Sequence, residues 1–213
     1  MEEVKKSLLL KDIAYNKIKE KILEEEFKPD RFLSERELID LLQMSKTPIK
    51  SALDRLETEG FVTVSSKQGI AVKDLSIEQI IDIYHLRVAI ETYNCEQIYK
   101  TITEEQLNLL RENLTLTKNS VEKRDVKEFA KNDHEFHFLI AKFAKNKEIQ
   151  KILLNYNSHL LRITLRHLNR NPNRMEKFLQ EHEEIYLQLE KKNRRCIDLM
   201  RNHLKDSIKL LFS

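Results

Sequence analysis

Four side chains in the C-terminal half of the sequence could together hold a metal ion. Asp133 and His137 stand four residues apart in a segment with helical periodicity, which places both on one face of the expected helix. A carboxylate and an imidazole in this arrangement can share a metal. His182 and His203 lie further along the chain, each within another expected helix. Packing of these helices around one core would bring the four together as an Asp-His-His-His site.

The spacing alone leaves other interpretations open, because a histidine on a helix is more often a surface residue or a satisfied core group than a ligand. We expect such ordinary roles for the other four histidines, which are His85, His134, His159 and His167. Of these, His134 should point away from the face that carries Asp133 and His137. Three imidazoles with one carboxylate favour a borderline metal over calcium or magnesium. A metal-dependent hydrolase is one alternative function, but it needs a general base beside the metal, and Glu135 faces elsewhere on its helix.

A second polar group lies near the N-terminus, on a segment whose residues 49, 52, 53 and 56 are apolar. This i, i+3, i+4, i+7 pattern predicts a helix with one buried face, which leaves Lys46, Thr47 and Lys50 outward. If the helix lies in a DNA major groove, these three residues face base edges and phosphates. Every cationic contact of this kind would add affinity that falls with salt.

Two neighbouring segments could extend that surface. Arg36, near the start of the preceding helix, could contact the DNA backbone beside the groove. Lys67, Gln68 and Gly69 form the tip of an expected β-hairpin and could reach the adjacent minor groove or its phosphates. A capped helix with exposed lysines is usually only a solvated surface, so the order of the elements carries the DNA-binding prediction.

The elements that must position this group have clear boundary signals. Ala14, Ile18 and Ile22 predict a first helix, and residues 34–37 form a capping box for a second, with Leu38, Leu41 and Leu42 as its apolar face. Ser45 should cap the third helix, and Pro48 fits its first turn. The chain's two glycines, Gly60 and Gly69, should end that helix and form the hairpin turn, respectively, in left-handed backbone. Three helices followed by a hairpin predict a winged helix-turn-helix.

After residue 73 the strand signals nearly vanish, which marks a boundary between domains 1–75 and 76–213. The second domain should be an all-α bundle of about six helices, so that the fold class is mainly α. Their expected spans are 77–101, 103–122, 126–144, 147–170, 173–190 and 193–212. Plausible caps precede them, including Ser76 and Thr103, and Pro172 should lie just inside the fifth. Short connections favour antiparallel neighbours.

The composition says less about function than these motifs do. The net charge of +3 is small, and residues 1–75 hold 14 Lys and Arg against 15 Asp and Glu, so bulk charge does not identify a nucleic-acid partner. The isolated cysteines, Cys95 and Cys196, fit neither a disulfide framework nor a metal motif and suggest a reducing cytoplasm. We expect no signal peptide and no membrane partner, because no apolar run approaches the ~20 residues that a membrane helix needs.

The N-terminal motifs together resemble the GntR-family winged helix. Residues 32–38, 44–62 and 69–72 carry this similarity, which spans about residues 10–73. The family usually has a glycine where Asp30 stands and arginines at positions 46 and 50. Lysine lacks the planar fork with which arginine binds guanine in bidentate fashion, so the resemblance implies DNA contact there without the family's usual sequence preference. Arg36 is retained.

The C-terminal segments resemble the FCD effector domain of the FadR subfamily of GntR regulators. Residues 133–137, 181–185 and 200–204 look like its three metal-ligand segments, and residues 83–91 look like its opening helix. Arg87 then matches an arginine that lines the ligand cavity. Six helices rather than seven resembles the VanR-like branch.

The resemblance implies a one-component bacterial transcription regulator rather than an enzyme. It would form a homodimer through the helical domain, bind a palindromic DNA operator, and hold a divalent ion, commonly zinc or nickel, at Asp133, His137, His182 and His203. Open positions on the ion, together with Arg87, would bind a small organic or sugar acid as the effector. A regulator with a metal-free cavity for an acyl ligand remains the alternative. The residues do not distinguish a repressor from an activator.

Overall fold

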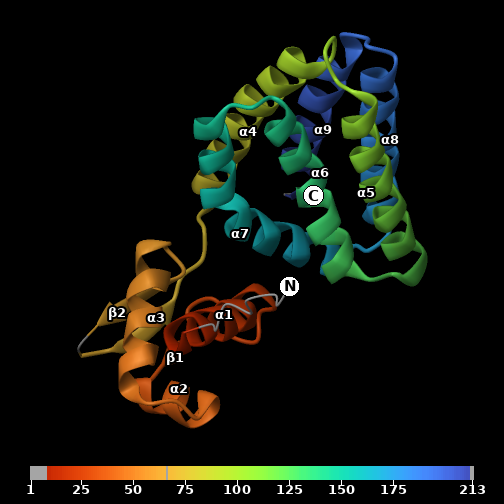
Figure 1. Cartoon of the computed structure of the whole chain (residues 1–213). Coiled ribbons are helices and arrows are strands. Elements are labelled where there is room, and N and C mark those ends of the chain that lie inside the picture. The colour runs from red at the N-terminus through yellow and green to blue at the C-terminus, as the bar shows by residue number, and fades with distance from the viewer. Residues whose placement is uncertain (1–8, 66, 212–213) are drawn as a thin grey trace, which may run out of the picture. The chain divides into compact units, whose positions relative to one another are not determined.

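The computed structural model describes residues 9–65 and 67–211, and the chain divides into two compact units, Met1–Leu75 and Ser76–Ser213 (Figure 1). Each unit has a hydrophobic core of its own. The fold class is the one that the sequence predicts: a small helix-and-sheet unit followed by a helical unit. Within the described part of the chain, no helix is long and apolar enough to cross a membrane.

The first unit contains three helices and a small sheet (Figure 1). The helices are α1 (Leu10–Leu23), α2 (Glu35–Leu42) and α3 (Lys46–Thr58), and the strands are β1 (Phe32–Leu33), β2 (Val62–Ser65) and β3 (Gly69–Val72). The antiparallel hairpin β2–β3 is confirmed, with Val62 opposite Val72. The sequence does not predict β1, which pairs with β3 to give the order β1-β3-β2. A two-residue strand has no alternation from which to recognise it.

Apolar spacing correctly predicts most of the core of the first unit. Residues 49, 52, 53 and 56 of α3 are at most 1% exposed, and they pack with Ile18 and Ile22 of α1. Leu41 is an exception: it was expected on the buried face of α2 but is 47% exposed. Over the eight residues of α2, Leu38 and Leu42 already fill the face toward the core.

The caps of the first unit agree with expectation only in part. Ser34 accepts a hydrogen bond from the backbone N–H of Glu37 at 3.0 Å, as a capping residue should. Ser45 takes the N-cap position of α3, but its side chain makes no capping bond. Both glycines adopt the expected positive φ, +80° at Gly60 and +85° at Gly69. Asp30, where the GntR family usually has glycine, also has a positive φ of 61°, a conformation that aspartate tolerates better than most residues.

The second unit consists, in its described residues, of six helices near their expected spans. They are α4 (Ile77–Ile98), α5 (Glu104–Lys123), α6 (Val126–Phe143), α7 (Lys147–Arg170), α8 (Arg174–Glu190) and α9 (Arg195–Leu211). Full capping boxes open α4, at Ser76, and α5, at Thr103. The sequence wrongly predicts Pro172 inside the fifth of these helices, α8. Pro172 precedes α8, because a turn with hydrogen bonds between residues three apart intervenes before the helix begins.

Helix α6 occupies the centre of the second unit, where it contacts α4, α5, α7 and α8. Helix α9 packs against α4 and α8, as Figure 1 shows. Eleven of the eighteen residues of α6 are buried, and among them are Asp133 and His137. One face of α6, which carries Lys131, Glu135 and Lys142, is exposed, and the remaining faces lie in the core. Asp133 and His137 are therefore held inside the protein, where they need partners.

Candidate functional sites

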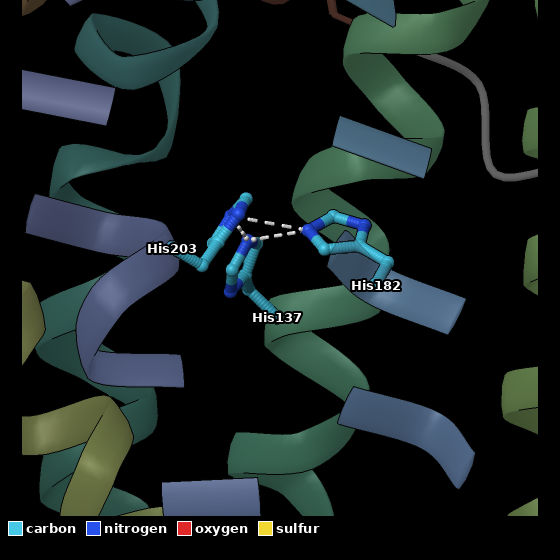
Figure 2. A group of neighbouring side chains, drawn as sticks. All are labelled: His137, His182 and His203. Carbon is cyan, nitrogen blue, oxygen red and sulfur yellow. Dashed lines mark hydrogen bonds between the residues drawn. The ribbon is translucent and has the colours of Figure 1, made fainter. Parts of the chain in front are cut away.

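Three histidines from three helices converge in the second unit. His137 of α6, His182 of α8 and His203 of α9 direct their Nε2 atoms toward one point, as Figure 2 shows. The Nε2–Nε2 distances are 3.2 Å for His182 with either neighbour and 3.3 Å between His137 and His203. All three residues are at most 5% exposed. The sequence placed these histidines on three separate helices, and the fold unites them.

Two carboxylates hold the outer nitrogens of this three-histidine cluster. Glu91 Oε2 lies 2.6 Å from His137 Nδ1, and Glu181 Oε2 lies 2.7 Å from His203 Nδ1. A carboxylate at Nδ1 favours the tautomer with its proton on that atom, which leaves the Nε2 lone pair free. Two lone pairs therefore point into a shared centre, and one proton from His182 cannot satisfy both. The cluster could hold a metal ion, which would satisfy all three.

The distances also suit a metal. In a tetrahedral site with metal–nitrogen bonds of about 2.0–2.1 Å, neighbouring ligand atoms are roughly 3.3 Å apart. The three Nε2 atoms already have this separation. Asp133, the fourth predicted ligand, lies beside the cluster, with its Oδ1 3.7 Å from His182 Nε2. The structure thus gathers three of the predicted ligands tightly and leaves the fourth adjacent to them.

Burial keeps the imidazoles of His137 and His182 in the form that binds metals. It lowers the pKa of His137, and it holds the pKa of His182 well below its usual range because no water solvates the charged ring. The His182 ring stacks on Phe136 with centroids 4.3 Å apart, which fixes its orientation. Neutral, oriented imidazoles need not lose a proton before they bind a cation.

Arg87 lies close to this cluster on α4 and is 5% exposed. Its Nε donates to Glu91 Oε1 at 2.6 Å. Burial alone would raise the pKa of Glu91, but Arg87 and His137 outweigh it and hold the pKa well below its usual range. A pocket of about 370 Å³, its open mouth included, adjoins the cluster. Its lining includes Tyr84, Arg87, Asp133, His137, His203 and Phe178.

The proposed DNA-contacting residues of the first unit are exposed. On α3, Thr47 and Lys50 face solvent, and the Lys46 side chain is 67% exposed, with its Nζ 2.7 Å from Glu35 Oε2. The Arg36 side chain is 91% exposed and has Asp40 as a distant partner at 3.8 Å. These positions leave the residues accessible to a duplex, and their contact with DNA stays a prediction.

The β2–β3 turn presents Lys67 and Gln68 to solvent. Gly69 has a structural role as well: a Cβ atom there would lie 2.8 Å from the carbonyl oxygen of Leu33 in β1. The turn can approach β1 so closely because this residue lacks a side chain.

Each of the two units matches a known protein family. The FCD domain model matches residues 82–206, and the model of the bacterial regulatory proteins, gntR family, matches residues 10–72. The chain belongs to the GntR family and carries an FCD domain. It is therefore a DNA-binding transcription regulator with an effector-binding C-terminal unit.

Individual relatives extend this similarity over most of the chain. The HTH-type transcriptional regulator YdhC of Bacillus subtilis strain 168 is 28% identical over 184 residues, which cover 84% of this chain and 80% of the relative. The Nta operon transcriptional regulator of Aminobacter aminovorans is 32% identical over 125 residues, 59% of each chain. A solved GntR regulator from Rhodococcus sp. RHA1 has the same fold, with a TM-score of 0.79 at 19% identity over 95% of this chain and 97% of that one.

The other histidines of this GntR-family regulator differ in their surroundings. His85 is exposed, whereas His134 is buried with its Nε2 3.1 Å from Thr164 Oγ1. Burial lowers the pKa of His134 to about 4. His167 lines the pocket beside the three-histidine cluster, a role that the sequence did not predict.

The sequence also missed both carboxylates that contact the cluster. Glu91 follows Arg87 by four residues, so their shared helix face was visible in advance. The contact between Glu91 and His137 could not be predicted, because the two residues lie on different helices. Glu181 directly precedes His182 in the sequence, but it contacts His203 of α9. No local sequence pattern predicts that contact.

Proposed function

We propose that this GntR-family regulator senses a small organic or sugar acid through a divalent metal ion held by its FCD domain. His137, His182 and His203 would be ligands, with Asp133 as the fourth. The convergence of three Nε2 atoms, with the outer nitrogens of two rings held by carboxylates, carries this proposal. The donor set suits zinc or nickel better than magnesium or calcium. When bound, the ion supplies a positive centre that attracts a carboxylate.

Arg87 is the residue that would recognise the acid alongside the metal. It lines the same pocket as Asp133, His137 and His203. Its bond to Glu91 uses the Nε proton, so Glu91 does not occupy the terminal nitrogens of the guanidinium. A planar guanidinium can hold a carboxylate in bidentate fashion, which gives both charge and orientation to the recognition.

Residues 1–75 would bind DNA, and residues 76–213 would bind the effector and form a homodimer. Six helices in the described part of the second unit support the VanR-like branch of the FadR subfamily. One helix reads few base pairs, so a palindromic operator contacted by two protomers is the arrangement that yields useful specificity. The acid would act by shifting the relative placement of the two DNA-binding units.

A regulatory rather than an enzymatic role has two supports. The relatives that the chain matches are transcription regulators. Glu135, which lies between Asp133 and His137 in the sequence, is exposed on α6. Glu91 and Glu181 each face a ring nitrogen of a histidine instead of acting as a general base for a bound water.

The DNA-binding part is tested on the protein's own upstream DNA by gel shift or anisotropy. We expect sequence-selective binding that weakens as salt rises. Lys46→Ala should reduce the slope of log affinity against log salt by about 1 for each half-site, and so by about 2 for a dimer on a two-half-site operator, as expected for the loss of one phosphate contact per protomer. Lys118→Ala, which removes an exposed lysine of α5, is the matched control and should leave the slope unchanged. Binding that ignores both sequence and salt would end the proposal.

The metal and effector part is tested on the purified protein. Elemental analysis should find one divalent ion per chain, and the His137→Ala, His182→Ala double variant should lose it, while His85→Ala retains it. In a thermal-shift screen of small acids, an effector should raise the melting temperature of the wild type by mass action. A stoichiometric acid bound without any metal would instead support the metal-free cavity.

A further inference from the structure

One buried carboxylate joins the two parts of the effector site. Glu91 uses Oε1 to accept the Nε proton of Arg87 at 2.6 Å, and its Oε2 lies 2.6 Å from His137 Nδ1. The Arg87, Glu91 and His137 side chains are 6%, 1% and 4% exposed, respectively. No bulk water surrounds the carboxylate, so a partner lost on one side is not replaced by solvent.

The geometry of this bridge makes its two ends depend on each other. The carboxylate is rigid and planar. Its Oε1 contacts Arg87 of the same helix, α4, and its Oε2 contacts His137 of α6. If the guanidinium turns toward an anion in the pocket, Oε1 loses or shifts its donor and the whole group reorients. Oε2 moves with it, and the 2.6 Å contact that sets the tautomer and the tilt of the His137 ring changes.

We propose that Glu91 is a positioning residue that transmits the state of Arg87 to His137, and thereby links binding of the acid to the strength of metal binding. The inference rests on the proposed metal and acid site and adds a named route between its two halves. By linkage, the factor by which a bound acid changes the affinity for the metal equals the factor by which the bound metal changes the affinity for the acid.

The chain offers a matched control in Glu181. Its Oε2 lies 2.7 Å from His203 Nδ1, so it orients that ring as Glu91 orients His137. Its other neighbour is Lys177 on the same helix, at 3.6 Å and half exposed, instead of Arg87. The two glutamates thus contact the histidine cluster in the same way, and they differ in the second partner and in side-chain exposure, which is 1% for Glu91 and 22% for Glu181.

The experiment measures Zn²⁺ affinity of the full-length, metal-free protein by competition with a chromophoric chelator. The variants are Glu91→Gln, Glu181→Gln and Arg87→Gln, and Arg87→Gln combined with each of the others. Glu91→Gln and Glu181→Gln should each weaken Zn²⁺ binding by about 10- to 100-fold. Arg87→Gln should change Zn²⁺ affinity by the same factor in the wild-type and Glu181→Gln backgrounds, and should have no effect in the Glu91→Gln background.

An Arg87→Gln effect that survives unchanged in Glu91→Gln, or that is absent from the wild type, would overturn the inference while leaving the metal site standing. A wild type that binds no Zn²⁺ would overturn the proposed function as well. If circular dichroism shows that Glu91→Gln does not fold, Arg87→Lys decides the matter. In nitrogen-15 spectra of the imidazoles, Arg87→Lys should shift Nδ1 of His137 and leave Nδ1 of His203 in place, and equal shifts, or none, would contradict the bridge.

Discussion

The histidines of α6 are buried as neutral rings, so a lower pH should reduce the free energy of unfolding. Burial lowers the pKa of His134 to about 4, and the ring is hydrogen-bonded to Thr164. In an unfolded chain the pKa would be about 6.5. Between these two values the unfolded state binds more protons than the folded state. The stabilisation is therefore complete above about pH 6.5 and is lost as the pH falls toward 4.

We expect the metal-free protein to lose up to about 3 kcal/mol of unfolding free energy from His134 alone across that range. His137 and His182 contribute with the same sign, because burial lowers their pKa values too. His134→Gln should make the dependence of stability on pH shallower, and His85→Gln, at an exposed position, should not. Urea unfolding at pH 7, 6 and 5 measures this. Parallel pH profiles for His134→Gln and the wild type would contradict the assignment.

At the scale of single residues, the sequence could predict which side chains share one helix face but not which side chains meet between helices. The pair Asp133 and His137 was visible as an i, i+4 spacing, whereas His182 and His203 were only candidates from their helices until the family resemblance favoured them. Glu91 and Glu181 each lie within one helix of the chain but act on another, at His137 and His203. Their partners are 46 and 22 residues away in sequence, and only the packed fold reveals such distant pairs.

Among the elements, the helices of the second unit were predicted to within a few residues, and α7 was predicted at its observed bounds, 147–170. The capping boxes at Ser76 and Thr103 set the starts of α4 and α5, since both the side-chain and the backbone bonds form. The two-residue strand β1 was missed, because it has no pattern of its own and exists only through pairing with β3. Leu41 was misassigned because a short helix offers more apolar residues than its buried face can accept.

Gly69 is the first residue of β3 and lies close to the backbone of β1. Replacing it tests how much this close approach contributes to the sheet. Gly69→Ala combines a positive φ with a Cβ only 2.8 Å from a backbone oxygen of Leu33, so the sheet must shift. We expect a loss of about 1–3 kcal/mol in the stability of the first unit and weaker DNA binding. Zn²⁺ binding by the second unit should be unchanged. Gln68→Ala, at an exposed neighbouring position, should leave the melting temperature as it is; an equally stable Gly69→Ala would show that the turn relaxes freely.

At the scale of the whole molecule, the distribution of charge bears on how the regulator binds DNA. The N-terminal domain has 14 basic and 15 acidic residues, so it gains little from bulk electrostatic attraction. Lys46 is itself paired with Glu35. One DNA-binding unit on one half-site should therefore bind weakly. Useful affinity then requires two units joined through a dimer, where the second contact becomes intramolecular.

We accordingly expect a duplex with two inverted half-sites to bind about 10²- to 10⁴-fold more tightly than the same duplex with one half-site scrambled. Inserting about 5 base pairs between the half-sites turns them to opposite faces of the helix and should abolish the gain, whereas about 10 base pairs returns them to one face and should restore part of it. Fluorescence anisotropy measures each affinity, and sedimentation at the same concentration establishes the dimer. If the dimer is present and one half-site binds as tightly as two, each protomer reads DNA independently, and a two-fold operator is not what this regulator recognises.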